Sequence, residues 1–140
     1  MWSKVALLVL VTCLMNLPAR AERLLEFGGV TVEAAVSPAY SACFNAAGGS
    51  DSRMAECMSA EAKLWDRRLN VAYGALRTRL NKNAFATLQA FQRAWIAERD
   101  ATCRDTGENG TMSRVVAASC NLRFTVLRAV ELEMRAAGGG

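Results

Sequence analysis

The sequence predicts an all-α fold: a small antiparallel helical bundle stapled by disulfides, with three long helices and one short N-terminal helix. The length of 140 residues suits one domain, and 52% hydrophobic with 21% charged residues is typical of a globular chain. Apolar residues recur at helical spacing along three long segments, and short connections between such segments favour antiparallel neighbours. Four of the five cysteines remain once an export signal is removed, which suits two disulfides in an exported chain.

Residues 1–21 predict a cleaved signal peptide. A lysine near the start precedes a short apolar run over 5–14, and Ala19-Arg20-Ala21 forms an A-x-A cleavage site. The apolar run is much shorter than the ~20 residues that a membrane span needs. The alternative is a lipoprotein signal that ends at Cys13, but Thr12 fits poorly just before that cysteine. We therefore expect a periplasmic or secreted product without a membrane span.

The N-terminal part of the mature chain predicts an arm followed by a short helix. Residues 22–36 are expected to form a loosely held arm, in which Val30-Thr31-Val32 is compatible with a short extended piece. The helical domain is expected over 37–136. Ser37-Pro38 starts its first helix, because serine is a good N-cap and proline suits the first helical position. This helix should run to about Ala47 and end at Gly48-Gly49.

A long second helix is expected over about 53–80, because apolar residues at steps of three and four form one stripe. Turn-prone Asn81-Lys82-Asn83 then breaks the pattern, and a third helix over about 84–104 follows. The stripe of the second helix contains Met58, Ala62, Trp65, Leu69, Ala72, Leu76 and Leu80, with Tyr73 widening it. The third helix is expected to turn Phe85, Leu88, Phe91, Trp95 and Ile96 inward.

Residues 104–111 form a loop by composition, and a fourth helix is expected over about 113–136. Residues 137–140 are expected to form a disordered tail. The inward residues of the fourth helix are expected to be Val116, Cys120, Phe124, Leu127, Val130 and Met134.

The composition excludes several kinds of chemical site. Because the chain contains no histidine, it has no Ser-His or Cys-His nucleophile pair and no CxxCH haem motif. The mature cysteines lack CxxC spacing, which argues against a zinc site and against a redox motif. Loss of Lys4 and Arg20 with the signal leaves 15 basic against 13 acidic residues, a charge of +2 that is spread along the chain. We therefore expect no cofactor, no metal and no nucleic-acid partner.

The four mature cysteines are expected to form structural disulfides. A turn near residue 82 brings Cys43, Cys57, Cys103 and Cys120 to one pole of the bundle, so helical geometry leaves the pairing open. Proximity in the sequence favours Cys43–Cys57 and Cys103–Cys120. The second of these bridges would hold both ends of a loop over 104–113.

The same helical register predicts polar contacts across the bundle. It places Asp66 opposite Arg99 and Tyr73 opposite Gln92, with Asn70 as a further polar residue near the apolar stripe. A carboxylate that faces a guanidinium can form a bidentate contact, which would help to fix the register of the helices. The alternative is that Asp66 and Arg99 are exposed charges that never meet.

Three groups of residues form a pattern over about 43–132. The groups are Cys57, Glu61, Asp66, Leu69-Asn70, Tyr73 and Leu76; then Gln92-Arg93-Ala94-Trp95-Ile96, Arg99-Asp100 and Cys103; then Gly110-Thr111-Met112, Cys120, Thr125, Arg128 and Leu132. This pattern resembles the N-terminal domain of the LprI-like lysozyme inhibitors, which are small exported bacterial proteins. One departure is Asn109, since the family's loop tends to read Gly-Gly-Thr-Met.

The resemblance implies an exported protein that binds and blocks lysozyme or another peptidoglycan hydrolase. Such enzymes use two carboxylates in a cleft, so we expect a rigid projection to fill that cleft. The alternative is a non-catalytic periplasmic interaction or structural module with an unidentified envelope partner. Catalysis by Glu61, Asp66 or Asp100 ranks below both, because nothing distinguishes these residues from ordinary helical carboxylates. The expected partner-binding residues are Arg104, Glu108, Asn109, Gly110, Thr111, Met112 and Arg114.

Overall fold

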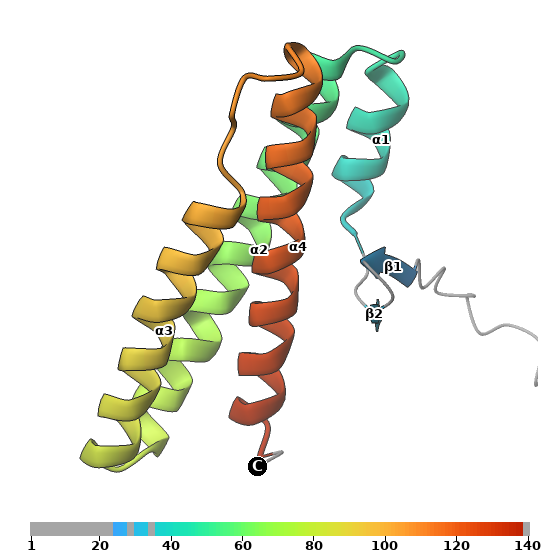
Figure 1. The fold of residues 1–140 in the computed structure, drawn as a ribbon. Helices are drawn as coiled ribbons and strands as arrows, with labels where there is room; N and C mark the ends of the chain where they lie inside the picture. Colours follow the sequence, from blue (N-terminus) through green and yellow to red (C-terminus); the bar gives the residue numbers. More distant parts are fainter. Residues whose placement is uncertain (1–23, 28–29, 34–35, 139–140) are drawn as a thin grey trace, which may run out of the picture.

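The computed structural model describes residues 24–27, 30–33 and 36–138, and these form four helices and one pair of short strands (Figure 1). The helices confirm the predicted all-α bundle. The signal peptide expected over 1–21 lies outside the described residues. The elements are β1 (Leu24–Phe27), β2 (Val30–Glu33), α1 (Pro38–Ala46), α2 (Asp51–Arg79), α3 (Lys82–Thr102) and α4 (Thr111–Ala136).

The N-terminal arm contains more regular structure than the sequence predicted. Strands β1 and β2 pair in antiparallel fashion, with Leu24 opposite Glu33 and Phe27 opposite Val30. The prediction recognised only an extended piece at residues 30–32. The preceding apolar stretch supplies the strand that pairs with it.

Side-chain caps mark the starts of α1 and α3. The Ser37 hydroxyl accepts a hydrogen bond from the Tyr40 amide at 3.1 Å, and the Asn81 side chain accepts one from the Ala84 amide at 2.9 Å. Gly48 and Gly49 have φ values of +57° and +80°, which other residues rarely adopt, and they separate α1 from α2. Each long helix begins and ends within two residues of its predicted limits.

The core lies mainly between α2 and α4, which pack along each other, while α3 flanks them and α1 contacts α2 (Figure 1). Small residues such as Ala72 and Ala129 allow the two long helices to approach closely. No helix within the described ranges is long and apolar enough to span a bilayer. The buried core cluster contains Ala62, Trp65, Leu69, Ala72, Leu76, Leu88, Leu122, Val126, Ala129 and Leu132.

The inward face predicted for α3 is wrong at two positions. Phe91 is 64% exposed and Ile96 is 39% exposed, while the polar side chain of Gln92 is buried. Residues 85, 88, 92, 95 and 99 keep strict steps of three and four, and Phe91 lies about 100° away from Gln92 around the helix axis. Because α3 meets its neighbours along one narrow stripe, it cannot bury both faces.

The predicted face of α4 is also rotated from the observed one. Val116 is 57% exposed and Met134 is 64% exposed, although both were expected to point inward. The prediction followed the bulky side chains, whereas the closely packed contact with α2 selects a face that includes small residues. That face contains Leu122, Thr125, Val126, Ala129 and Leu132.

The two disulfides have the pairing that proximity in the sequence favoured. Cys43 is bonded to Cys57, with their Cα atoms 5.7 Å apart, and this bridge fastens α1 to α2. Cys103 is bonded to Cys120, with their Cα atoms 5.3 Å apart, and this bridge joins the end of α3 to α4. Both bridges lie in the half of the bundle opposite the turn between α2 and α3.

Candidate functional site

The loop between α3 and α4 runs along the side of the bundle instead of turning sharply at its tip (Figure 1). The reason is a difference in helix length. Helix α3 has 21 residues and α2 has 29, so α3 falls short of the start of α2 by about 12 Å at 1.5 Å per residue. Residues 103–110 must therefore climb alongside α2 and α4 before α4 begins.

Contacts at three points hold this loop in place. The Cys103–Cys120 bridge fixes its start. In the middle, the Asp105 carboxylate accepts hydrogen bonds from the Ser113 hydroxyl and from the Gly107 amide, the latter at 3.0 Å. At its end, the Thr111 hydroxyl donates to the Asp51 carboxylate at 2.8 Å. The loop is therefore tied to both α2 and α4.

The electrostatic state of Asp105 reflects these contacts. The hydrogen bond from Ser113, and then that from the Gly107 amide, hold the pKa of the Asp105 carboxyl below its ordinary value of 3.8. Both bonds stabilise the ionised form, because each donates a proton toward the negative oxygen. Asp105 is therefore a positioning group within the loop.

All seven residues expected to bind a partner are exposed. Thr111, Met112 and Arg114 belong to the first turns of α4, and the other four belong to the preceding loop. Gly110 has a φ of +59°, a left-handed conformation in which glycine avoids the strain of a side chain. The loop members are Arg104, Glu108, Asn109 and Gly110.

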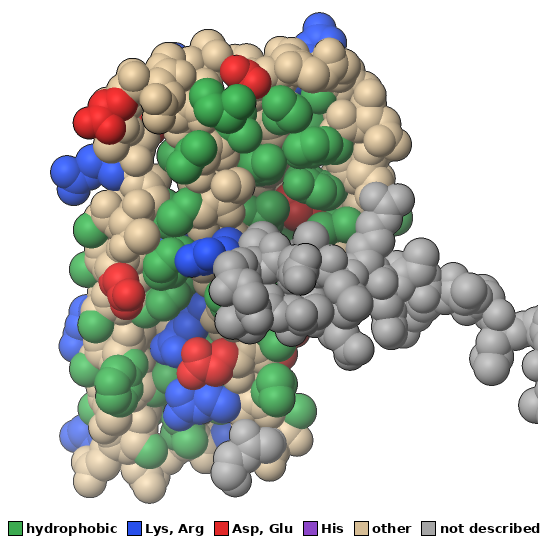
Figure 2. Space-filling model, turned by 45° about the vertical axis from the view of Figure 1, so that its right-hand side comes forward, with side chains coloured by type: hydrophobic (Ala, Val, Ile, Leu, Met, Phe, Trp, Pro, Cys, Tyr) green, Lys and Arg blue, Asp and Glu red, His purple; other side chains and the backbone are tan. Residues whose placement is uncertain are grey.

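An apolar patch adjoins the loop. Met112 is 46% exposed and Val116 is 57% exposed, and the four-residue spacing puts them on one face of α4. Figure 2 shows hydrophobic side chains gathered over the upper half of the molecule. The sequence prediction missed Val116 as a surface residue because it assigned this valine to the core. We call the 103–110 loop together with residues 111–116 the loop pole.

A polar groove lies between α2 and α4 beside the loop. Its two parts share Ser59, Lys63, Ala118 and Asn121. Asp105 and Arg114 border the upper part, while Asp66, Arg99 and Thr125 border the lower part. The groove exists because α3 ends short of this region and leaves the junction of α2 and α4 uncovered.

The cross-helix contact predicted between Asp66 and Arg99 does not form. Asp66 instead accepts a hydrogen bond from Asn70 Nδ2 at 3.1 Å, one turn along the same helix. Arg99 pairs with Asp100 at 2.8 Å, and its guanidinium lies 4.9 Å from the centre of the Trp95 ring. Nearby partners on each helix satisfy both groups, so the two residues line one groove without bonding.

The predicted pairing of Tyr73 with Gln92 is also wrong. Tyr73 packs against Phe85, with ring centres 5.4 Å apart. Gln92 Oε1 accepts a hydrogen bond from Arg128 Nε at 2.8 Å, and Arg128 Nη1 pairs with Glu131 at 2.8 Å. A buried arginine on α4 thus takes the place expected for a tyrosine on α2.

Glu61 has a structural role that the sequence did not reveal. Its buried carboxylate accepts hydrogen bonds from the Ser37 amide at 2.9 Å, the Ser37 hydroxyl at 2.6 Å and Trp65 Nε1 at 3.2 Å. These contacts fasten the start of α1 to α2. Burial, and after it the nearby negative charge of Glu61, raises the pKa of the Tyr40 hydroxyl above its ordinary value of 10.0.

One known protein family matches the part of the chain that carries these features. The family model described as lysozyme inhibitor LprI matches residues 43–132, a range that contains both disulfides and the loop pole. The chain belongs to the LprI lysozyme inhibitor family. The matched range of this LprI-family protein leaves out the strands and the Ser37 anchor. No curated protein and no solved structure matches the chain.

Within the described ranges, no cluster of three or more histidine, cysteine or acidic residues is placed to hold a metal ion.

Proposed function

We propose that this chain is an exported inhibitor that binds a lysozyme or another peptidoglycan hydrolase through the loop pole and blocks its cleft. The observation that carries the proposal is the anchored loop, which projects no catalytic group and is fixed at its start, middle and end. Membership of the LprI family supports the inhibitor class. The two disulfides support an oxidising compartment, either the periplasm or the extracellular space.

The loop pole has the composition of a recognition surface. Met112 and Val116 supply an apolar centre, while Arg104 and Arg114 supply charge around it. Such an arrangement, with an apolar centre and a polar rim, is typical of protein interfaces. A guanidinium forms strong hydrogen bonds with a carboxylate, and a peptidoglycan hydrolase carries two carboxylates in its cleft.

The anchoring of the loop supports tight binding on energetic grounds. Ordering a flexible loop during association costs about 0.5–1.5 kcal/mol for each immobilised side chain. The Cys103–Cys120 bridge and the Asp105 hydrogen bonds order the loop before binding. More of the contact energy then remains as affinity.

An inhibition assay tests this proposal. Mature protein over 22–140 should inhibit lysis of peptidoglycan, and the double variant Arg104→Ala/Arg114→Ala should weaken inhibition by about tenfold or more, because each arginine contributes about 1 kcal/mol to a carboxylate contact. The matched control is Arg77→Ala/Arg79→Ala, which removes two exposed arginines at the far end of α2 and should leave inhibition unchanged.

Two outcomes would contradict the proposal. One is a complete lack of inhibition at tens of micromolar against both animal and bacterial enzymes. The other is equal weakening by the two arginine pairs, which would indicate a general charge effect. Capture of an envelope protein that is not a hydrolase, without inhibition, would instead support the interaction-module alternative.

A further inference from the structure

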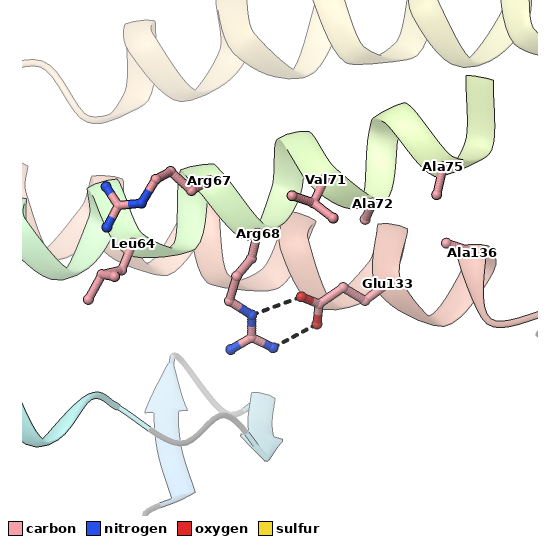
Figure 3. Close-up of a pocket in the computed structure, with 8 residues that line it drawn as sticks. All are labelled: Leu64, Arg67, Arg68, Val71, Ala72, Ala75, Glu133 and Ala136. Carbon is pink, nitrogen blue, oxygen red and sulfur yellow. Dashed lines mark hydrogen bonds and ion pairs between the residues drawn. The ribbon is translucent and has the colours of Figure 1, made fainter. Parts of the chain in front are cut away.

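An apolar groove between α2 and α4 lies apart from the loop pole (Figure 3). Val71 is 75% exposed and Leu64 is 36% exposed, which is unusual for two large aliphatic side chains in one groove. Arg68 and Glu133 bridge its edge with two hydrogen bonds of 2.8 Å. The remaining lining residues are Arg67, Ala72, Ala75 and Ala136.

The anchor at Ser37 holds the start of α1 close to this groove. Ser37 is bonded to Glu61, one turn of α2 before Leu64. From that point α1 runs toward the start of α2, because Cys43 is bonded to Cys57. The start of α1 is therefore the end of this helix nearer to the groove, which extends from Leu64 toward the end of α2.

The reach of the strands from Ser37 also matches the position of the groove. The groove runs from Leu64 to Ala75, which is about 5–21 Å beyond Glu61 at 1.5 Å per helical residue. Strand β2 ends four residues before Ser37, so at about 3.3 Å per extended residue it can reach roughly 13–23 Å from the anchor. The strands can therefore lie over the groove without any change in the helices.

The register of the two strands gives them an apolar face. Residues directly opposite each other in an antiparallel pair share a face, and successive pairs alternate between faces. The pairs Leu25–Val32 and Phe27–Val30 fall on one face, so four apolar residues lie together there. The pairs on the other face are Leu24–Glu33 and Glu26–Thr31.

We propose that β1 and β2 of the same chain dock their apolar face on the groove of Leu64 and Val71. An isolated two-stranded hairpin is only marginally stable in water and needs a hydrophobic surface to pack against. The groove offers that surface, because Leu64 and Val71 expose their side chains in it. Docking covers the apolar groove, while the apolar patch of the loop pole stays exposed.

Hydrogen exchange on the mature protein over 22–140 tests this contact. Val71→Arg places a charge in the groove at a position exposed enough to leave the fold intact, which the melting temperature verifies. The backbone amides of β1 and β2 should exchange about tenfold faster in V71R than in the parent, because docking suppresses local opening. The matched control is Ala86→Arg, an exposed position on α3, which should leave exchange in the strands unchanged.

Nuclear Overhauser contacts between the Phe27 ring and the Val71 methyl groups provide the second readout, and they should be intramolecular. Equal exchange rates in the parent and V71R, together with no such contact, would overturn the proposal. Contacts that appear only between differently labelled molecules would also overturn it, since the occupant would then be the hairpin of a second copy. This test does not depend on inhibition of any hydrolase.

Discussion

Replacement of Glu61 by alanine should destabilise the folded protein by about 3 kcal/mol. The carboxylate is 2% exposed and accepts three hydrogen bonds, two from Ser37 and one from Trp65 Nε1. Each bond contributes about 1 kcal/mol, and the Trp65 N–H is left buried without its acceptor. For a folded region of about a hundred residues, this loss corresponds to a fall in Tm of roughly 12 °C or more.

Urea denaturation followed by circular dichroism measures this change, and a double-mutant cycle with Ser37→Ala isolates the contact. We expect a coupling energy of about 1 kcal/mol or more between Ser37 and Glu61, since residues in one hydrogen-bond network are not additive. Glu56→Ala is the matched control, because Glu56 is exposed on the same helix and should change stability by less than about 0.5 kcal/mol.

The reasoning fails if Glu61→Ala and Glu56→Ala have equal effects, or if the coupling between Ser37 and Glu61 is close to zero. In either case the anchor would not hold α1 against α2. The tether that holds the start of α1 close to the apolar groove would then lose its basis.

Three further predictions address the core, the buried arginine and the loop. Leu88→Ala should cost about 2–5 kcal/mol in urea denaturation, whereas Phe91→Ala should cost less than about 0.5 kcal/mol, and equal costs would contradict the observed face of α3. Arg128→Ala should cost about 3 kcal/mol by the same method, because it leaves the Gln92 acceptor buried and unpaired; unchanged stability would refute this role. Because the folded pKa of Asp105 is lowered, its contribution to stability is present above about pH 3.8 and disappears as the pH falls through the folded value. Carbon NMR of the Asp105 carboxyl should show a midpoint below 3.8 that Ser113→Ala moves upward, and a midpoint insensitive to that substitution would exclude the hydrogen bond as the cause.

Local signals in the sequence were sufficient for the helices and the disulfides. Ser37-Pro38 and Asn81 mark helix starts through their own backbone chemistry, and glycines mark the end of α1. The disulfide partners are also near each other in the chain, so proximity in the sequence predicted the pairing of the cysteines, which helical geometry had left open. The residues expected on the loop pole are exposed because polar and glycine-rich segments rarely enter a core.

Local signals in the sequence did not predict how each helix is rotated about its axis. Phe91 and Val116 are as apolar as true core residues, and only contact with a neighbouring helix decides which face is buried. Local signals also did not predict the partners of the polar side chains. Asp66 and Arg99 each have a closer partner on their own helix, and Arg128 reaches Gln92 across a helix pair that the predicted register did not bring together.

The sequence by itself determined the number and limits of the helices, favoured the observed bridge pairing and showed a resemblance to the family, because each depends on residues close in the chain or on a recognisable pattern. Only the tertiary structure decided that Glu61 anchors α1, that Val116 joins the loop pole and that an apolar groove stays open beside Val71. These features depend on how closely α2 and α4 pack and on where the shorter α3 stops covering them. Packing distance and helix overlap arise between elements, so no single segment encodes them.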